Sequence, residues 1–132
     1  MKNILHICIV DDDDIYKYAL TKSVATLLEG NQVSLFANGE DTLDHILTHQ
    51  NDLAALPDII LLDIDMPVMD GFQFLEEYEK IAHSLAKKIT IYMVSSSVDP
   101  EDVIRAKSFE TVTDYISKPL NENKFESILS EL

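Results

Sequence analysis

Carboxylates gather at two places in this sequence of 132 residues. Residues 11–14 are four consecutive aspartates that directly follow an apolar run, and Asp63 closes a second apolar run. Ser95 and Lys118 follow two further apolar runs, so a hydroxyl and an ammonium group stand in equivalent positions. An ionisable group that ends a buried run needs a partner, because an isolated buried charge is costly. These residues are therefore the first candidates for a binding or reactive site.

Such a cluster of carboxylates has a defined chemistry. Crowded carboxylates repel one another, which raises the pKa of some of them unless a cation lies between them. Mg²⁺ suits this role, because it takes oxygen ligands octahedrally, uses few carboxylates and keeps several waters. A carboxylate beside such an ion can act as a nucleophile on phosphorus and form an aspartyl phosphate. That reaction depends mainly on neutralising the transferred group, to which Lys118 and the Ser95 hydroxyl would contribute.

The apolar runs predict five strands, over residues 4–10, 32–36, 58–62, 89–94 and 115–116. Between these runs, apolar residues recur at helical spacing, and the last such stripe consists of Phe125, Ile128, Leu129 and Leu132. Strands that alternate with helices predict an α/β fold with a doubly wound parallel sheet and helices on both faces. In such sheets, ligands bind beyond the carboxyl ends of the strands. We therefore expect the four polar stretches to converge on one edge.

Composition narrows the function classes. The net charge is −14, from 24 acids and 10 bases, which argues against nucleic-acid or anionic-membrane binding and favours a divalent cation or a basic partner surface. The apolar runs are too short to cross a bilayer, and we expect no signal peptide, because the first residues show neither its apolar region nor its cleavage site. Cys8 is the only cysteine, so a disulfide framework is excluded. We expect one cytoplasmic domain over residues 1–132.

The stretch over residues 59–71 reads Ile-Ile-Leu-Leu-Asp-Ile-Asp-Met-Pro-Val-Met-Asp-Gly. Together with the acidic pair, the hydroxyl and the lysine, in that order, it resembles the receiver domains of bacterial response regulators. The resemblance covers essentially the whole chain. It implies a five-stranded sheet in the flavodoxin-like order 2-1-3-4-5. It also implies a phosphoacceptor of a two-component or phosphorelay system, which takes a phosphoryl group from a histidine kinase or a histidine phosphotransfer protein and signals to an unknown downstream protein.

The resemblance also implies a metal site. Asp12 would bind Mg²⁺ directly, and Asp11 would contribute directly or through water. Asp63 would be both a metal ligand and the phosphoacceptor, and the backbone carbonyl of Asp65 would be a further ligand. Asp65 is itself a departure, because the family is variable at this position and often has a neutral side chain there.

A second group of residues would respond to the phosphoryl group. The resemblance makes Ser95 the switch hydroxyl and Lys118 the phosphate-binding lysine, which is usually followed by a cis-proline peptide. Tyr115 matches the aromatic residue whose rotamer tracks activation. These roles, like those of the metal ligands, are implied by the family pattern.

Several of these residues also have a purely structural interpretation. Asp13 and Asp14 extend the acidic run, and stabilisation of a helix N-terminus explains them better than a metal does. Asp99, directly before Pro100, is a better helix cap than Ser95, which leaves Ser95 for ligand contact. His45 and His49 have a spacing compatible with metal binding, yet no third ligand is evident. We expect both histidines to be exposed to solvent.

Two alternatives concern the whole protein. Asp63-Ile64-Asp65 also resembles the aspartate pair of haloacid-dehalogenase-type phosphatases. In those enzymes, however, the nucleophile normally follows the first strand, and Thr or Val stands where this chain has Pro67. We therefore expect no conventional enzyme, only self-phosphorylation and autodephosphorylation at Asp63. The terminal helix favours a stand-alone protein, and a receiver cut from a longer regulator or hybrid kinase is the alternative.

Overall fold

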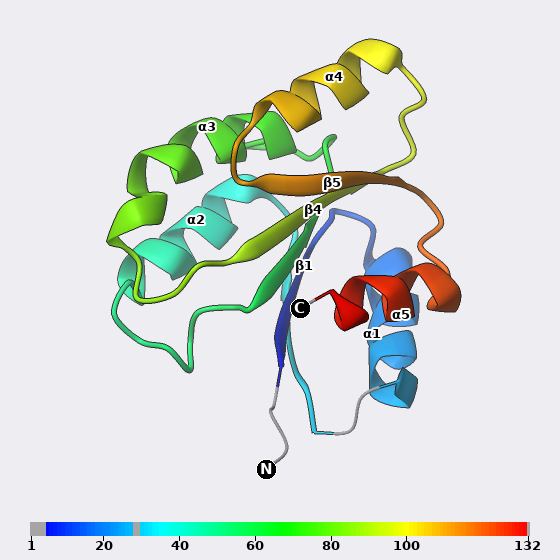
Figure 1. Cartoon of the computed structure of the whole chain (residues 1–132), viewed down its shortest axis with the longest axis horizontal. Coiled ribbons are helices and arrows are strands. Elements are labelled where there is room, and N and C mark those ends of the chain that lie inside the picture. Colours follow the sequence, from blue (N-terminus) through cyan, green and yellow to red (C-terminus); the bar gives the residue numbers. More distant parts are fainter. Residues whose placement is uncertain (1–4, 28–29, 132) are drawn as a thin grey trace.

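The computed structural model describes residues 5–27 and 30–131. Ile4 and Leu132, which the sequence assigns to the first strand and to the terminal helix, lie outside these residues. Strands and helices alternate along the chain (Figure 1). The strands are β1 (His6–Val10), β2 (Gln32–Phe36), β3 (Ile59–Leu62), β4 (Thr90–Ser95) and β5 (Val112–Ser117). The helices are α1 (Asp14–Leu27), α2 (Gly39–Thr48), α3 (Gly71–Ile81), α4 (Pro100–Ser108) and α5 (Glu122–Ser130), with a short 3₁₀ helix, η1 (Ala82–Ser84), after α3.

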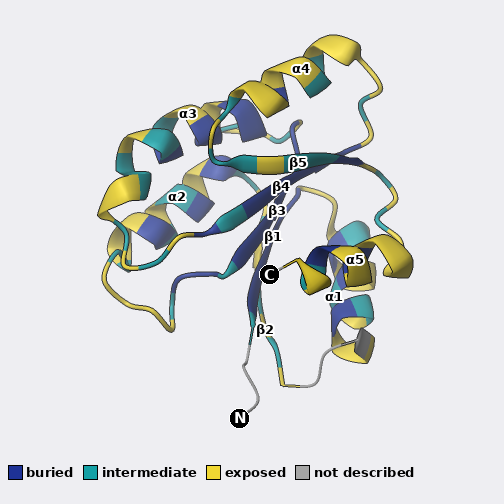
Figure 2. Cartoon of the chain, in the orientation of Figure 1, coloured by how far each residue is buried: buried dark blue, intermediate teal, exposed yellow. Residues whose placement is uncertain are grey.

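The five strands form one parallel sheet in the order β2-β1-β3-β4-β5, which confirms the predicted fold class and strand order. The central strands β1 and β3 are buried along their whole length, while the edge strands β2 and β5 carry exposed residues (Figure 2). This is why the two central strands appear in the sequence as uninterrupted apolar runs.

Two apolar clusters cover the two faces of the sheet. On one face, Leu20 of α1 and Phe125 of α5 pack with residues such as Ile9 of β1. On the other face, α2, α3 and α4 cover the sheet, and Phe74 of α3 and Ala106 of α4 belong to that core. Figure 1 shows the same separation, with α1 and α5 on one side and α2 to α4 on the other. The sheet is therefore packed between two layers of helices.

Among the described residues, β1 and β3 begin slightly later than predicted, at His6 and Ile59, and the differences that affect the site occur at the last two strands. β4 ends at Ser95 itself, so the candidate hydroxyl belongs to the strand and is not part of the following loop. β5 begins at Val112, three residues before the predicted start at Tyr115. Its added residues include the polar pair Thr113 and Asp114, and the register shifts where this part pairs with β4. Because β5 is an edge strand, its exposed polar residues hide the apolar pattern.

The loop after β3 is held in a tight conformation. Asp70 caps α3, because its side chain accepts a hydrogen bond from the Gln73 N–H while the Gln73 side chain accepts from the Asp70 N–H. Gly71 lies so close to the backbone carbonyl of Asp63 that a Cβ at this position would collide with it. Val68 takes a positive φ of 69° and is mostly exposed. The loop thus folds back onto the end of β3.

The prediction that His45 and His49 are exposed is wrong. Both side chains are half-buried, and their rings are in contact in a tilted arrangement, with centroids 4.4 Å apart. His45 Nε2 lies 3.0 Å from the carbonyl oxygen of Ala55, in the loop that follows α2. Helical spacing alone does not show that this loop folds back over the end of α2. Neither histidine takes part in a cluster of metal ligands among the described residues.

Candidate functional site at the carboxyl edge of the sheet

Three aspartates meet where β1 and β3 end. Val10 and Leu62, the last residues of these strands, are paired in the sheet, and the Asp63 N–H donates to the carbonyl of Val10 over 3.0 Å. Each of Asp11, Asp12 and Asp63 therefore has a carboxylate oxygen within 4.8 Å of the others. The predicted convergence of these carboxylates is confirmed.

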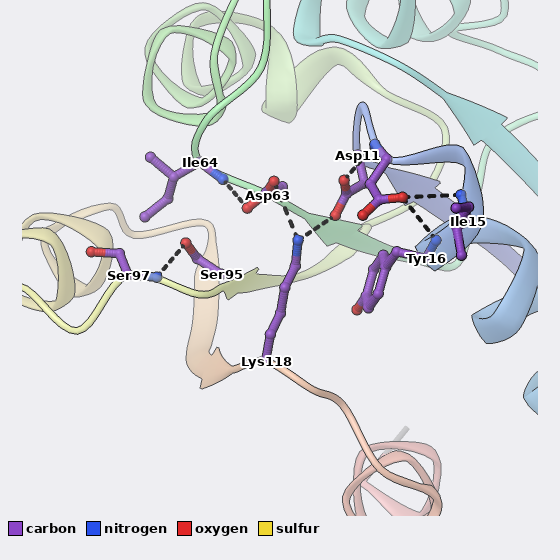
Figure 3. A network of polar contacts seen from close by, with 9 residues as sticks. Asp11, Ile15, Tyr16, Asp63, Ile64, Ser95, Ser97 and Lys118 are labelled. Carbon is purple, nitrogen blue, oxygen red and sulfur yellow. Dashed lines mark hydrogen bonds and ion pairs between the residues drawn. The ribbon is translucent and has the colours of Figure 1, made fainter.

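Lys118 joins the acidic cluster from the end of β5. Its Nζ lies 2.6 Å from Asp11 Oδ2 and 3.4 Å from Asp63 Oδ2 (Figure 3). Its backbone N–H donates to the carbonyl of Ser95 over 2.9 Å, which ties the end of β5 to the end of β4. The Lys118–Pro119 peptide is cis, as the resemblance implies. The sequence predicts that Lys118 lies at the same edge as Asp63, and the structure adds direct contacts with Asp63 and, at a shorter distance, with Asp11.

For both Asp63 and Lys118, burial shifts the pKa in one direction and the oppositely charged partner shifts it in the other. Asp11 is 2% exposed and Asp63 8% exposed. Burial and the nearby Asp11 charge raise the pKa of Asp63 to about 6, although Lys118 and the Ile64 N–H lower it. Burial alone would lower the pKa of Lys118, but its hydrogen bond to Asp11 and the charge of Asp63 raise it. At neutral pH Asp63 is therefore mainly a carboxylate, and Lys118 is an ammonium.

The donor set fits a hard divalent cation. Asp11, Asp12 and Asp63 offer oxygen atoms only, and Asp12 is exposed, so that the cluster opens to solvent on one side. Mg²⁺ prefers such oxygen ligands and retains waters on its open side. The side chain of Asp65 is exposed, and the role of its backbone carbonyl stays a prediction.

The other two aspartates of the acidic run, Asp13 and Asp14, make contacts within the first turns of α1. Asp13 Oδ1 accepts hydrogen bonds from the N–H groups of Ile15 and Tyr16, at 3.0 and 3.1 Å, which is the geometry of a helix cap. Asp14 is exposed and lies 3.4 Å from Lys17 Nζ. These contacts agree with the helix-stabilising interpretation of both residues.

The two predicted switch residues meet at Ser97. The Ser95 hydroxyl oxygen is buried and accepts a hydrogen bond from the Ser97 N–H over 3.1 Å, so its own proton is available to another acceptor (Figure 3). The Tyr115 hydroxyl donates to the Ser97 carbonyl over 2.9 Å. The Ser97 hydroxyl in turn donates to Asp102, in the first turn of α4, over 2.6 Å. The segment between β4 and α4 is thus hydrogen-bonded to both predicted switch residues, Ser95 and Tyr115.

Sequence reasoning missed two residues of this site. The role of Ser97 could not be predicted, because two of its contacts are made by its backbone N–H and carbonyl, and such contacts do not depend on the residue type. Tyr16 has a helical spacing with Leu20, which marks it as a packing residue. Its ring centroid nevertheless lies 4.5 Å from Lys118 Nζ, at the edge of the acidic cluster. Its place two residues after a run of acids was the only available signal.

Comparisons with known proteins agree on one family. The chain matches the response regulator receiver domain family over residues 7–130. It is 33% identical to Protein PilH of Pseudomonas aeruginosa, over 88% of this chain and 87% of that protein. It is 30% identical to a protein-glutamate methylesterase/protein-glutamine glutaminase of Geobacter sulfurreducens, over 87% of this chain but only 28% of that protein.

Solved structures show the same fold. A two component response regulator from Cytophaga hutchinsonii superposes with a TM-score of 0.86 at 24% identity, covering 98% of this chain and 97% of that one. This likeness concerns the fold. In the part of the chain that the structure describes, none of the helices combines the length and apolar character that crossing a membrane requires.

Proposed function

Since the chain belongs to the response regulator receiver domain family, we propose that it accepts a phosphoryl group on Asp63 from a histidine kinase or a histidine phosphotransfer protein. One observation carries this assignment to a residue. Asp63 closes the buried strand β3, has two other carboxylates beside it, and has the Lys118 ammonium 3.4 Å from its Oδ2. A buried carboxylate with this surplus of negative charge around it favours binding of a cation and of a group that the cation neutralises.

The proposed step is a transfer between two side chains. A carboxylate oxygen of Asp63 attacks the phosphorus of a phosphohistidine, the P–N bond breaks, and the imidazole leaves with the bonding electron pair and takes a proton from solvent. The pKa of about 6 leaves Asp63 ionised at neutral pH and therefore ready to attack. Lys118 is placed to neutralise the incoming group, and the buried Ser95 hydroxyl has a proton to donate.

We propose Mg²⁺ as the cofactor, held by Asp11, Asp12 and Asp63 and by the backbone carbonyl of Asp65. Bound there, it would neutralise charge on the transferred phosphoryl oxygens. The support is the all-oxygen donor set within 4.8 Å. Residues of the chain would orient the Asp63 carboxylate, since the Ile64 N–H donates to one of its oxygens over 2.9 Å and Lys118 faces the other.

The phosphoryl group would act through a changed protein-binding surface. The supporting contacts run from Ser95 to Ser97, and from Ser97 to Tyr115 and to Asp102 of α4. A shift of Ser95 toward a phosphoryl group would disturb all of them. The recipient would be a downstream protein, and the charge of −14 argues against nucleic acid or an anionic membrane as the partner.

We further propose that the protein is no conventional enzyme and works in the cytoplasm, where kinases have ATP. Its only covalent chemistry would be gain and loss of phosphate at its own carboxylate. Hydrolysis of a generic phosphomonoester such as p-nitrophenyl phosphate with many turnovers would contradict this and favour a phosphatase.

The test is phosphoryl uptake from a small donor. Incubation with acetyl phosphate or phosphoramidate and Mg²⁺ should add one phosphoryl group, and Asp63→Asn should abolish the addition. The chain has no tryptophan, so intact mass is the measurement rather than intrinsic tryptophan fluorescence. Asp58→Asn, which alters the aspartate at the other end of β3, is the matched control and should still be labelled. Equal labelling of Asp63→Asn and the unaltered protein would refute the assignment.

A further inference from the structure

Three contacts fix the ammonium group of Lys118. Its Nζ lies 2.6 Å from Asp11 Oδ2, 3.4 Å from Asp63 Oδ2 and 4.5 Å from the centroid of the Tyr16 ring. Figure 3 shows the Tyr16 ring beside the Lys118 side chain, next to the carboxylates. A cation over an aromatic face at this distance is attracted by the ring quadrupole. Two of the three contacts are therefore ionic, and the third is not.

We propose that Tyr16 is a positioning residue for Lys118, which keeps the ammonium near Asp63 when the acidic cluster is occupied by a cation. This inference rests on the proposed function of the site. The two ionic contacts go to residues that would bind the metal. A divalent ion there would take up the negative charge of Asp11 and would repel the ammonium. Of the three contacts, only the one with the Tyr16 ring is free of that competition.

The ring, and not the hydroxyl, carries this role. Among the described residues, the buried Tyr16 hydroxyl has no hydrogen-bond partner. A buried hydroxyl without a partner destabilises the folded state. Tyr16→Phe should therefore keep the positioning of Lys118 and leave the protein as stable as before or more stable. Tyr16→Leu removes the aromatic face while it keeps an apolar side chain of moderate size.

The same helix provides a matched control. Tyr18 is 63% exposed, and Lys22 Nζ lies 5.0 Å from its ring centroid. The Tyr18–Lys22 pair thus has similar geometry, and because residues two positions apart do not share a face of a helix, Tyr18 lies on another side of α1 than Tyr16. Tyr18→Leu should remove a contact of the same kind without any effect on phosphoryl uptake.

The first experiment observes the position of Lys118 directly, by NMR of protein with ¹³C-labelled lysine. Protons that lie over an aromatic face resonate upfield, so the ε-methylene signal of Lys118, identified by its loss in Lys118→Arg, should stand upfield of an ordinary lysine. It should stay upfield when Mg²⁺ is added, in the unaltered protein and in Tyr16→Phe. An ordinary position, or a return to it with Mg²⁺, would overturn the proposal, whether or not Tyr16→Leu folds.

The second experiment measures the initial rate of phosphoryl uptake from acetyl phosphate at saturating Mg²⁺. Tyr16→Leu should be slower by about three- to thirtyfold, the range that corresponds to a cation–π contact. Tyr16→Phe and Tyr18→Leu should keep the rate, and the Mg²⁺ affinity of Tyr16→Leu should not fall. An unchanged rate in Tyr16→Leu would overturn the proposal. Absence of uptake by the unaltered protein would instead refute the proposed function, and the NMR result would still decide the role of Tyr16.

Discussion

Strand β3 has an aspartate at each end, and the two have different surroundings. Asp58, just before the strand, lies 2.9 Å from Lys87 Nζ and accepts a hydrogen bond from the His6 N–H over 2.8 Å. Asp63, just after the strand, shares Lys118 with Asp11 and has Asp12 nearby. Asp58 thus has a lysine of its own, whereas one lysine serves a group of three carboxylates at the other end.

This is the difference that we expect between a charge with a structural role and one with the proposed functional role. A carboxylate with its own ammonium partner and a backbone donor is satisfied within the protein, and it gains little from a ligand. A buried carboxylate among other carboxylates is not satisfied, and the pKa of Asp63, raised to about 6, reflects this. The surplus of negative charge at one end of the strand, more than the presence of an aspartate, marks the site.

The largest expected effect concerns the response of the site edge to a phosphoryl group. Such a group adds up to about two charges and three acceptor oxygens. If Ser95 and Lys118 both turn toward it, each charge-assisted contact contributes about 1.5–3 kcal/mol. Two contacts give about 3–6 kcal/mol, and about 5.5 kcal/mol is needed to shift a two-state ratio from 1:99 to 99:1. With one contact, in Ser95→Ala, the population stays mixed.

Hydrogen exchange measures this response. With Mg²⁺ and a phosphoryl analogue, protection should change over residues 96–109 and around Tyr115, and the change should be markedly smaller in Ser95→Ala. The segment around Asp58 at the other edge should not respond in either protein. Ser95→Ala should still accept phosphate, because the metal ligands are intact. Identical responses of both proteins would show that Ser95 does not couple the site to α4.

A smaller effect is expected on Mg²⁺ affinity when one of the proposed ligands is replaced. Loss of a residue that merely orients a metal ligand lowers metal affinity 10- to 100-fold, so Asp12→Asn, which removes a direct ligand, should lower Mg²⁺ affinity by at least about tenfold. Calorimetry is the measurement, and an unchanged affinity would refute the ligand role. Without Mg²⁺, Asp12→Asn should unfold at a higher urea concentration than the unaltered protein, because the remaining carboxylates then repel one another less.

The sequence predicts the central strands that carry Asp11 and Asp63 better than it predicts the side-chain contacts of these residues. β1 and β3 are buried on both faces, so their apolar runs show both the strands and the positions of Asp11 and Asp63. β5 is an edge strand with polar residues, and most of it was not predicted. The ion pair between Lys118 and Asp11 joins residues 107 positions apart. Strand order brings these two residues to one edge, but only side-chain geometry decides which carboxylate Lys118 contacts.

The two ends of β3 should respond in opposite ways to loss of charge. Asp58→Asn breaks a partly buried ion pair with Lys87 and should lower the free energy of unfolding by about 1–2 kcal/mol. Asp63→Asn removes a charge that its surroundings disfavour and should raise the free energy of unfolding in Mg²⁺-free buffer. Urea denaturation of both variants is the measurement. A loss of stability in Asp63→Asn as large as that in Asp58→Asn would contradict the contrast.

The smallest expected effect is the pH dependence of the contribution of His6 to stability, which can be compared with that of Asp63. Its side chain is 5% exposed, its Nε2 lies 2.7 Å from the Ser34 hydroxyl, and it lies near Lys87, Asp58 and His45. Burial lowers its pKa below the ordinary value of 6.5, although a backbone contact at Ala54 opposes this. Asp63, at the opposite edge, has a raised pKa, so its contribution to stability has the opposite dependence on pH.

For His6 the unfolded chain binds the proton more readily than the folded protein does. Its contribution to stability is therefore complete above pH about 6.5 and is lost as the pH falls below that value, by at most about 1.4 kcal/mol per pH unit. Subtracting the free energy of unfolding of His6→Gln from that of the unaltered protein cancels the contribution of Asp63. The difference should fall between pH 7.5 and pH 5.5. A constant difference for His6 would mean that the folded protein accepts this proton as readily as the unfolded chain.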